Sequence, residues 1–156
     1  MRGGVDGEGV EELLELFIEL LLDLFPGLIG PYRDQLDPLW QQTSELFGSL
    51  AANRGLAAGE AVEEAQLLRE ALLRLLYRDP PRAPTGAMGL REVLRLNRIM
   101  DELVTYASVG HTDALFFALF QGSGVPERLS DDVRYEIRNQ LEAIRHSLDE
   151  VRAVRR

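Results

Sequence analysis

The chain has 156 residues, no cysteine and a formal net charge of -9 at pH 7. This length fits one domain with a core of its own, and the absence of thiols excludes disulfides, cysteine nucleophiles and cysteine metal sites. The acidic balance argues against nucleic acid or an anionic membrane as a partner, because both carry negative charge. The chain also has no lysine, which removes Schiff-base and P-loop lysine chemistry. Because it has neither a signal-peptide pattern nor an uninterrupted apolar run of about 18 residues, we expect a cytoplasmic protein without a membrane-spanning helix.

Residues 1–7 are rich in glycine, and we expect them to be disordered. From Glu8 onward, apolar residues recur at three- and four-residue steps, which predicts a helix that ends at Pro26-Gly27. Ile18 and Leu22 widen the apolar face of this helix beyond one stripe. Either a second subunit or two neighbouring helices of one bundle would bury that surplus.

A second helix is predicted from Pro38 to about Asn53, with Asp37 as its N-cap. Gly48 inside this helix predicts either a bend or the close approach of a neighbour. The single tryptophan, Trp40, is expected to pack in the core, with ligand stacking as the alternative.

A third helix is predicted over residues 61–76, and the Pro- and Gly-rich residues 80–89 predict a loop. The fourth helix, over residues 90–107, has an apolar stripe at helical spacing that includes one amide, Asn97. Because a buried amide without a partner costs about 1–3 kcal/mol, we expect polar residues of another helix to contact Asn97.

The helical pattern is interrupted over residues 108–113, where the helix either kinks at Gly110 or ends and restarts with Thr112 as its N-cap. Ser130 then caps a last helix with an acidic first turn. The apolar residues of this helix follow coiled-coil spacing over two heptads, although a long helix of a bundle has similar spacing. The predicted coiled-coil positions are Ile137, Leu141, Ile144, Leu148 and Val151.

No strand pattern or internal repeat occurs, so the sequence predicts an all-α fold. We expect an antiparallel helical bundle of four to six helices with a C-terminal helix of coiled-coil type. Residues 8–129 would form the sensory or regulatory bundle, and residues 130–156 the helix for signalling or dimerisation.

The chain has no recognisable catalytic set of residues, so we expect no enzyme activity, no metal and no cofactor. Its two histidines, His111 and His146, are far apart in sequence, and His146 is expected on the solvated face of the last helix. One alternative is a bundle that binds a small molecule or haem in a pocket near Trp40, Tyr106, His111 and Phe116, with His111 as an axial ligand.

Two motifs carry a family resemblance. The first is Arg54 followed by Glu64-Ala-Gln-Leu-Leu-Arg69-Glu-Ala-Leu-Leu, and the second is Arg95-Leu-Asn97-Arg-Ile-Met-Asp101-Glu-Leu-Val. Together they resemble the R…E-x-x-x-L-R-x-x-L-L and R-x-N-x-x-x-D-x-x-L segments of the RsbRD N-terminal domain. This is the helical input domain of RsbT co-antagonist proteins and of some bacterial sensor histidine kinases, and the similarity covers roughly residues 45–107.

The resemblance implies a non-enzymatic input domain in a two-component or stress-response pathway. Its last helix would pass a signal to an output module, a kinase or another regulator by a change of helix packing or by partner binding. A homodimer in the cytoplasm is expected.

The spacing of the motif residues predicts a polar cluster between the third and fourth helices, which should be antiparallel neighbours. Arg69 would pair with Asp101 or Glu64, and Asn97 would bond to one of them. Such a cluster would either fix the register of the helices or act as a ligand or switch site.

Overall fold

Five α-helices make up most of the described part of the computed structural model, which covers residues 5–79 and 89–154. They are α1 (Val5–Ile29), α2 (Arg33–Asn53), α3 (Ala58–Arg78), α4 (Leu90–Phe120) and α5 (Asp131–Val154). None of the described residues forms a β-strand, so the predicted all-α fold is confirmed. Residues 5–7, which were expected to be disordered, belong to α1, whereas the loop predicted over 80–89 falls almost entirely outside the described residues.

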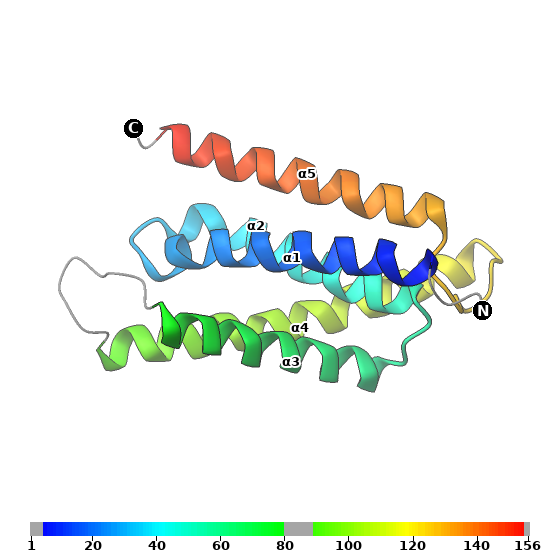
Figure 1. The fold of residues 1–156 in the computed structure, drawn as a ribbon, viewed down its shortest axis with the longest axis horizontal. Coiled ribbons are helices and arrows are strands. Elements are labelled where there is room, and N and C mark those ends of the chain that lie inside the picture. Colours follow the sequence, from blue (N-terminus) through cyan, green and yellow to red (C-terminus); the bar gives the residue numbers. More distant parts are fainter. Residues whose placement is uncertain (1–4, 80–88, 155–156) are drawn as a thin grey trace.

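The helix α2 lies at the centre of the bundle and contacts each of the other four helices. Successive helices run in opposite directions, with α5 on one side, α1 and α2 in the middle, and α3 and α4 on the other side (Figure 1). Both outer layers therefore rest on α2, and α4 makes the more extensive contact with it.

Aromatic side chains join α1 to α2 in the core. Phe17 packs edge-on against Phe47 with ring centroids 5.7 Å apart, and Phe25 packs in the same way against Trp40 at 6.1 Å. Edge-to-face pairs contribute about 0.5–1.5 kcal/mol beyond the burial of their area. Trp40 is 1% exposed, so the core position expected for it is confirmed.

The backbones of α2 and α4 touch where two glycines face the opposite helix. A Cβ atom on Gly48 would lie 1.7 Å from the carbonyl oxygen of Ala107, and one on Gly110 would lie 1.9 Å from that of Glu45. Any side chain at either position would clash with backbone that cannot rotate away. Gly48 therefore serves the close approach of a neighbour, which is one of the two roles predicted for it.

Two prolines lie inside helices rather than at their limits. Pro26 falls in the last turn of α1, which continues to Ile29, and Pro38 falls within α2, which begins at Arg33. The predicted N-cap role of Asp37 is therefore wrong, because Asp37 lies inside α2 with its Oδ2 3.4 Å from the Nε of Arg33. Each proline removes one hydrogen bond within two turns of a helix end, and the burial of flanking leucines outweighs that loss.

The helix α4 continues through residues 108–113 without a break. Ser108 and Thr112 each donate a 3.0 Å hydrogen bond from the hydroxyl group to the carbonyl oxygen four residues earlier. Both side chains thus bond inside the helix, and Thr112 is not the N-cap of a new one. The predicted cap of α5 is confirmed, since Ser130 Oγ accepts a 3.3 Å bond from the backbone N–H of Val133.

The coiled-coil stripe of α5 is buried within the chain. Ile137, Leu141, Ile144 and Leu148 are each at most 5% exposed, and Val151 is half-buried against the same core. The helix α5 packs on α1 and α2, so these residues fill an intramolecular interface. The arrangement observed is therefore the alternative of a long bundle helix, while the joining of two copies stays a prediction.

The surplus apolar residues of α1 also pack within the chain. Ile18 and Leu22 are partly buried and pack against the core of the chain. Of the two explanations for the wide apolar face of α1, neighbours within one bundle account for these two residues.

Candidate functional site

Two residues of the first motif form an ion pair that joins α2 to α3. Arg54 Nη1 lies 2.7 Å from Glu64 Oε1 and 2.9 Å from Glu64 Oε2, and both side chains are 23% exposed. Arg54 is the C-cap of α2, and Gly55 after it adopts φ 83°, a conformation that turns the chain toward α3. Glu64 is thus bound by Arg54 and not by Arg69.

Residues of both motifs form a second ion pair, which joins α3 to α4. Arg69 Nη1 lies 2.8 Å from Asp101 Oδ1, which is one of the two pairings expected for Arg69. The Asp101 side chain is 68% exposed, so this pair lies at the surface and not in a buried layer. Arg95, the first residue of the second motif, instead donates a 3.2 Å bond to the carbonyl oxygen of Ile29 at the end of α1.

Asn97 is exposed, and its predicted burial is wrong. The buried stripe of α4 contains Leu96, Ile99, Met100 and Leu103, so Asn97 lies one residue, or about 100°, away from its centre. The predicted cluster of Glu64, Arg69, Asn97 and Asp101 therefore does not exist as one unit. Instead, Glu64 pairs with Arg54, and Arg69 pairs with Asp101.

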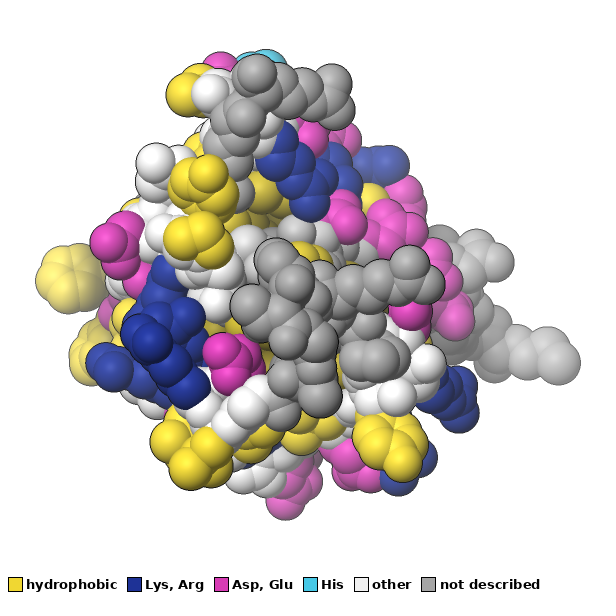
Figure 2. Space-filling view, turned by 90° about the vertical axis from the view of Figure 1, so that its left-hand side faces the viewer, with side chains coloured by type: hydrophobic (Ala, Val, Ile, Leu, Met, Phe, Trp, Pro, Cys, Tyr) yellow, Lys and Arg dark blue, Asp and Glu magenta, His cyan; other side chains and the backbone are white. Residues whose placement is uncertain are grey.

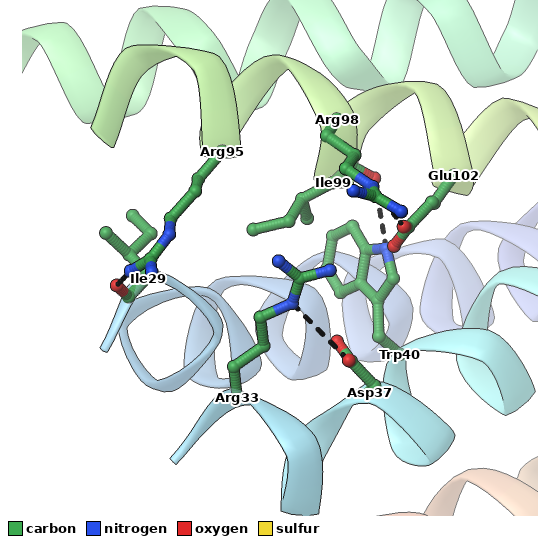
Figure 3. A network of polar contacts seen from close by, with 8 residues as sticks. All are labelled: Ile29, Arg33, Asp37, Trp40, Arg95, Arg98, Ile99 and Glu102. Atoms are coloured by element: carbon green, nitrogen blue, oxygen red, sulfur yellow. Dashed lines mark hydrogen bonds and ion pairs between the residues drawn. The ribbon is translucent and has the colours of Figure 1, made fainter. Parts of the chain in front are cut away.

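Trp40 connects α2 to α4 through its indole group. Its Nε1 donates a 3.1 Å hydrogen bond to the carbonyl oxygen of Ile99. This bond satisfies the only polar atom of a buried side chain, which is the usual arrangement for tryptophan in a core. The ion pairs drawn beside Trp40 in Figure 3 are Arg33–Asp37 within α2 and Arg98–Glu102 within α4.

His111 fastens α4 to the turn between α2 and α3. The side chain is 2% exposed, and its Nε2 lies 2.7 Å from the carbonyl oxygen of Leu56. A carbonyl oxygen can only accept, so Nε2 carries the hydrogen of this bond. This nitrogen is occupied in holding the fold together.

The pocket predicted near Trp40, Tyr106, His111 and Phe116 is not formed. Trp40 reaches α4 at Ile99, and His111 lies twelve residues further along that helix, a separation of about 18 Å. Tyr106 is half-buried, whereas Phe116 is 62% exposed. Aromatic residues spaced along one helix therefore face different surroundings, and nothing in their arrangement favours haem.

The C-terminal third of α4 exposes large apolar side chains. Their exposed fractions are 62% for Phe116, 66% for Phe117, 54% for Leu119 and 92% for Phe120. We call these four residues the aromatic end of α4. Contiguous apolar surface of this kind marks an interaction site more often than single exposed residues do.

Among the described residues, α4 alone is long and apolar enough to cross a membrane. This result rests on length and composition, and 22% of the residues in the apolar window are buried inside the chain. One such helix is weak evidence, because a core helix of a soluble protein meets the same test.

A groove of about 870 Å³ runs beside the aromatic end. Its floor is the second half of α2, and its walls are α4 from Gly110 to Ala118 and α5 from Asp132 to Ser147. The apolar lining residues are Leu46, Ala114, Phe117, Ala118, Val133, Ile137, Ala143 and Ile144. The sequence does not predict this groove, because the apolar pattern of one helix does not reveal which neighbouring helices remain apart.

At the end of the bundle where α1 meets α2, the surface is chemically mixed, unlike the apolar aromatic end of α4. Arginine, acidic and apolar side chains all reach the surface there in small separate patches (Figure 2). No group of three or more potential metal ligands occurs among the described residues. Comparison with protein-family models, curated proteins and solved structures found no match to this chain.

Proposed function

We propose that the chain is a non-enzymatic regulatory domain of a bacterial signalling protein, and that it works by binding a protein partner. The aromatic end of α4 carries this proposal. Phe116 and Phe120 are 62% and 92% exposed, and they follow the last buried residue of α4, His111. Leaving such side chains in water is unfavourable, by about 25 cal/mol for each Å² of apolar area, unless a partner covers them.

The motif resemblance supports the class of protein. Residues of the two motifs lie in cross-helix contacts, with Arg54–Glu64 joining α2 to α3 and Arg69–Asp101 joining α3 to α4. An input domain that signals by a change of helix packing needs contacts that transmit the change from one helix to the next. We infer that the domain belongs to a cytoplasmic sensor kinase or a stress-response regulator.

The contact between α2 and α4 supports a route for the signal. Because the backbones touch at Gly48 and Gly110, α4 cannot move closer to α2 there without pushing against it. α2 also contacts α5, the last helix described. A partner that displaces the aromatic end of α4 would therefore act on α5 through α2.

The experiment replaces the chromosomal gene of the source strain with a Phe116→Ser/Phe120→Ser variant and compares its transcript profile with that of a deletion strain. We expect the variant to reproduce the deletion profile at unchanged protein level. The matched control is Leu67→Ser/Tyr77→Ser, which removes two apolar side chains of α3 that are 66% and 89% exposed and should leave the profile as in the wild type.

Two results would contradict the proposal. In the first, the Phe116→Ser/Phe120→Ser strain behaves as the wild type while the deletion strain does not. In the second, the wild-type protein is recovered with the membrane fraction and the variant is not, which would make the aromatic end of α4 a lipid contact.

A further inference from the structure

The charged side chains that line the groove between α4 and α5 are all acidic. Of the residues that the structure describes, four carboxylates line it, from Glu45 on α2, Asp113 on α4, and Asp132 and Glu136 on α5, and no arginine does. Within the described residues, none of these four side chains takes part in an ion pair. The acidic groups of the groove are thus left unneutralised.

The arginines of α5 face the other way. Arg138 lies 2.7 Å from Glu12, and Arg145 lies 3.0 Å from Asp23, so both bind the acidic side of α1. The arginines on the basic side of α5 are therefore already paired with carboxylates of the same chain. The opposite side of α5 presents Asp132 and Glu136 to the groove.

The dimensions of the groove match one helix. The wall formed by α5 extends over residues 132–147, which is about 22 Å or four helical turns. Val133 and Ala143 are the apolar residues of this wall that remain accessible, and Phe117 faces the groove from α4. An amphipathic helix presents one apolar stripe, with its polar residues on either flank.

We propose that this groove binds an amphipathic helix of a partner protein whose flanks are rich in lysine or arginine. The apolar stripe of that helix lies on Leu46, Phe117 and Val133, and its cationic flanks face Asp113 on one wall and Glu136 on the other. The inference rests on the proposed partner-binding function and specifies the chemistry of the partner. Opposite charge steers such a helix into the groove and discriminates against acidic helices.

The probe is a fluorescein-labelled peptide of two heptads, each with the sequence Leu-Lys-Lys-Leu-Leu-Lys-Leu, measured by fluorescence anisotropy at about 0.1 M salt. The control peptide has glutamate in place of every lysine. We expect binding of the lysine peptide and at least about tenfold weaker binding of the glutamate peptide. Equal binding of the two peptides would overturn the proposal.

Matched charge variants separate the groove from the general attraction of an acidic protein for a cationic peptide. Asp113→Lys/Glu136→Lys reverses one exposed carboxylate on each wall, whereas Glu63→Lys/Asp149→Lys makes the same change in net charge outside the groove. We expect the groove variant to bind the lysine peptide about tenfold more weakly than the control variant, with both retaining wild-type circular dichroism. Equal affinities of these two variants would locate the peptide elsewhere and overturn the proposal.

The two proposals fail in different ways. If the peptide ignores the groove while Phe116→Ser/Phe120→Ser still reproduces the deletion profile, the partner-binding function stands and the cationic helix is wrong. A second outcome is that the chain binds phosphatidylglycerol vesicles but does not bind the lysine peptide. A membrane would then replace the helical partner, and this inference would be overturned.

Discussion

Arg54 Nη1 lies within 2.9 Å of both carboxylate oxygens of Glu64, so the end of α2 is tied to α3 across the turn between them. The two residues are ten positions apart in sequence and 23% exposed. His111 holds the same turn from α4 through the carbonyl oxygen of Leu56. The turn is thus fixed from both sides, and it sets how α3 enters the bundle.

Replacing Glu64 with Gln should lower the free energy of unfolding by about 1 kcal/mol, because a charge-assisted pair in a partly buried position is weakened. Urea denaturation measures the change. The control is Glu63→Gln, an exposed neighbour that forms no ion pair with any described residue, and this change should alter stability by less than about 0.5 kcal/mol. Equal effects of the two substitutions would show that the Arg54–Glu64 pair contributes nothing specific.

Substituting Gly48 with Ala should destabilise the chain by about 3 kcal/mol or more, because the new Cβ would meet the backbone of Ala107. The matched control is Gly59→Ala in the first turn of α3, where no atom lies within 4 Å of the new Cβ. That substitution should stabilise the protein by up to about 1 kcal/mol through helix propensity. Thermal unfolding followed by circular dichroism distinguishes the two, and a well-tolerated Gly48→Ala would mean that α2 and α4 do not touch.

The sequence predicts the all-α class and most of the helices, because apolar periodicity reports directly on a buried face. It gives a close approach at Gly48 as one of two explanations, the other being a bend, since a glycine inside a helix is costly. The cap at Ser130 follows from local chemistry alone. The periodicity and the cap have in common that their cause lies within a few residues of the chain, whereas the partner of Gly48 is Ala107 on another helix.

The predictions that were wrong concern which face of a helix meets which partner. α4 has apolar residues on two overlapping stripes, and exposed Leu94 belongs to the stripe that was expected to be buried. The packing of Gly110 on α2 selects the other stripe, and Asn97 is exposed as a result. In the same way, heptad spacing in α5 fits either a partner chain or a neighbour of the same chain. Only the three-dimensional arrangement decides between them.

Trp40 is the only tryptophan, so its fluorescence reports on the contact between α2 and α4. We expect blue-shifted emission and little quenching by acrylamide in the native state, since the side chain is 1% exposed. Trp40→Phe should cost about 2 kcal/mol in the free energy of unfolding, because it removes the bond to Ile99 and leaves space in the core. Red-shifted emission that acrylamide quenches readily in the native protein would contradict the burial of Trp40.

The interior position of the α5 stripe can be tested by placing a charge in it. Leu141 is 3% exposed against the rest of the chain, so Leu141→Asp should destabilise the fold by about 3 kcal/mol or more at any protein concentration. Asn139→Asp, which changes an exposed neighbour, should have little effect. If α5 instead formed a coiled coil between two chains, Leu141→Asp would halve the mass measured by light scattering and leave a folded monomer. Combined measurement of mass and chemical stability over a range of concentrations separates these outcomes, because only an interface between chains gives stability that rises with concentration.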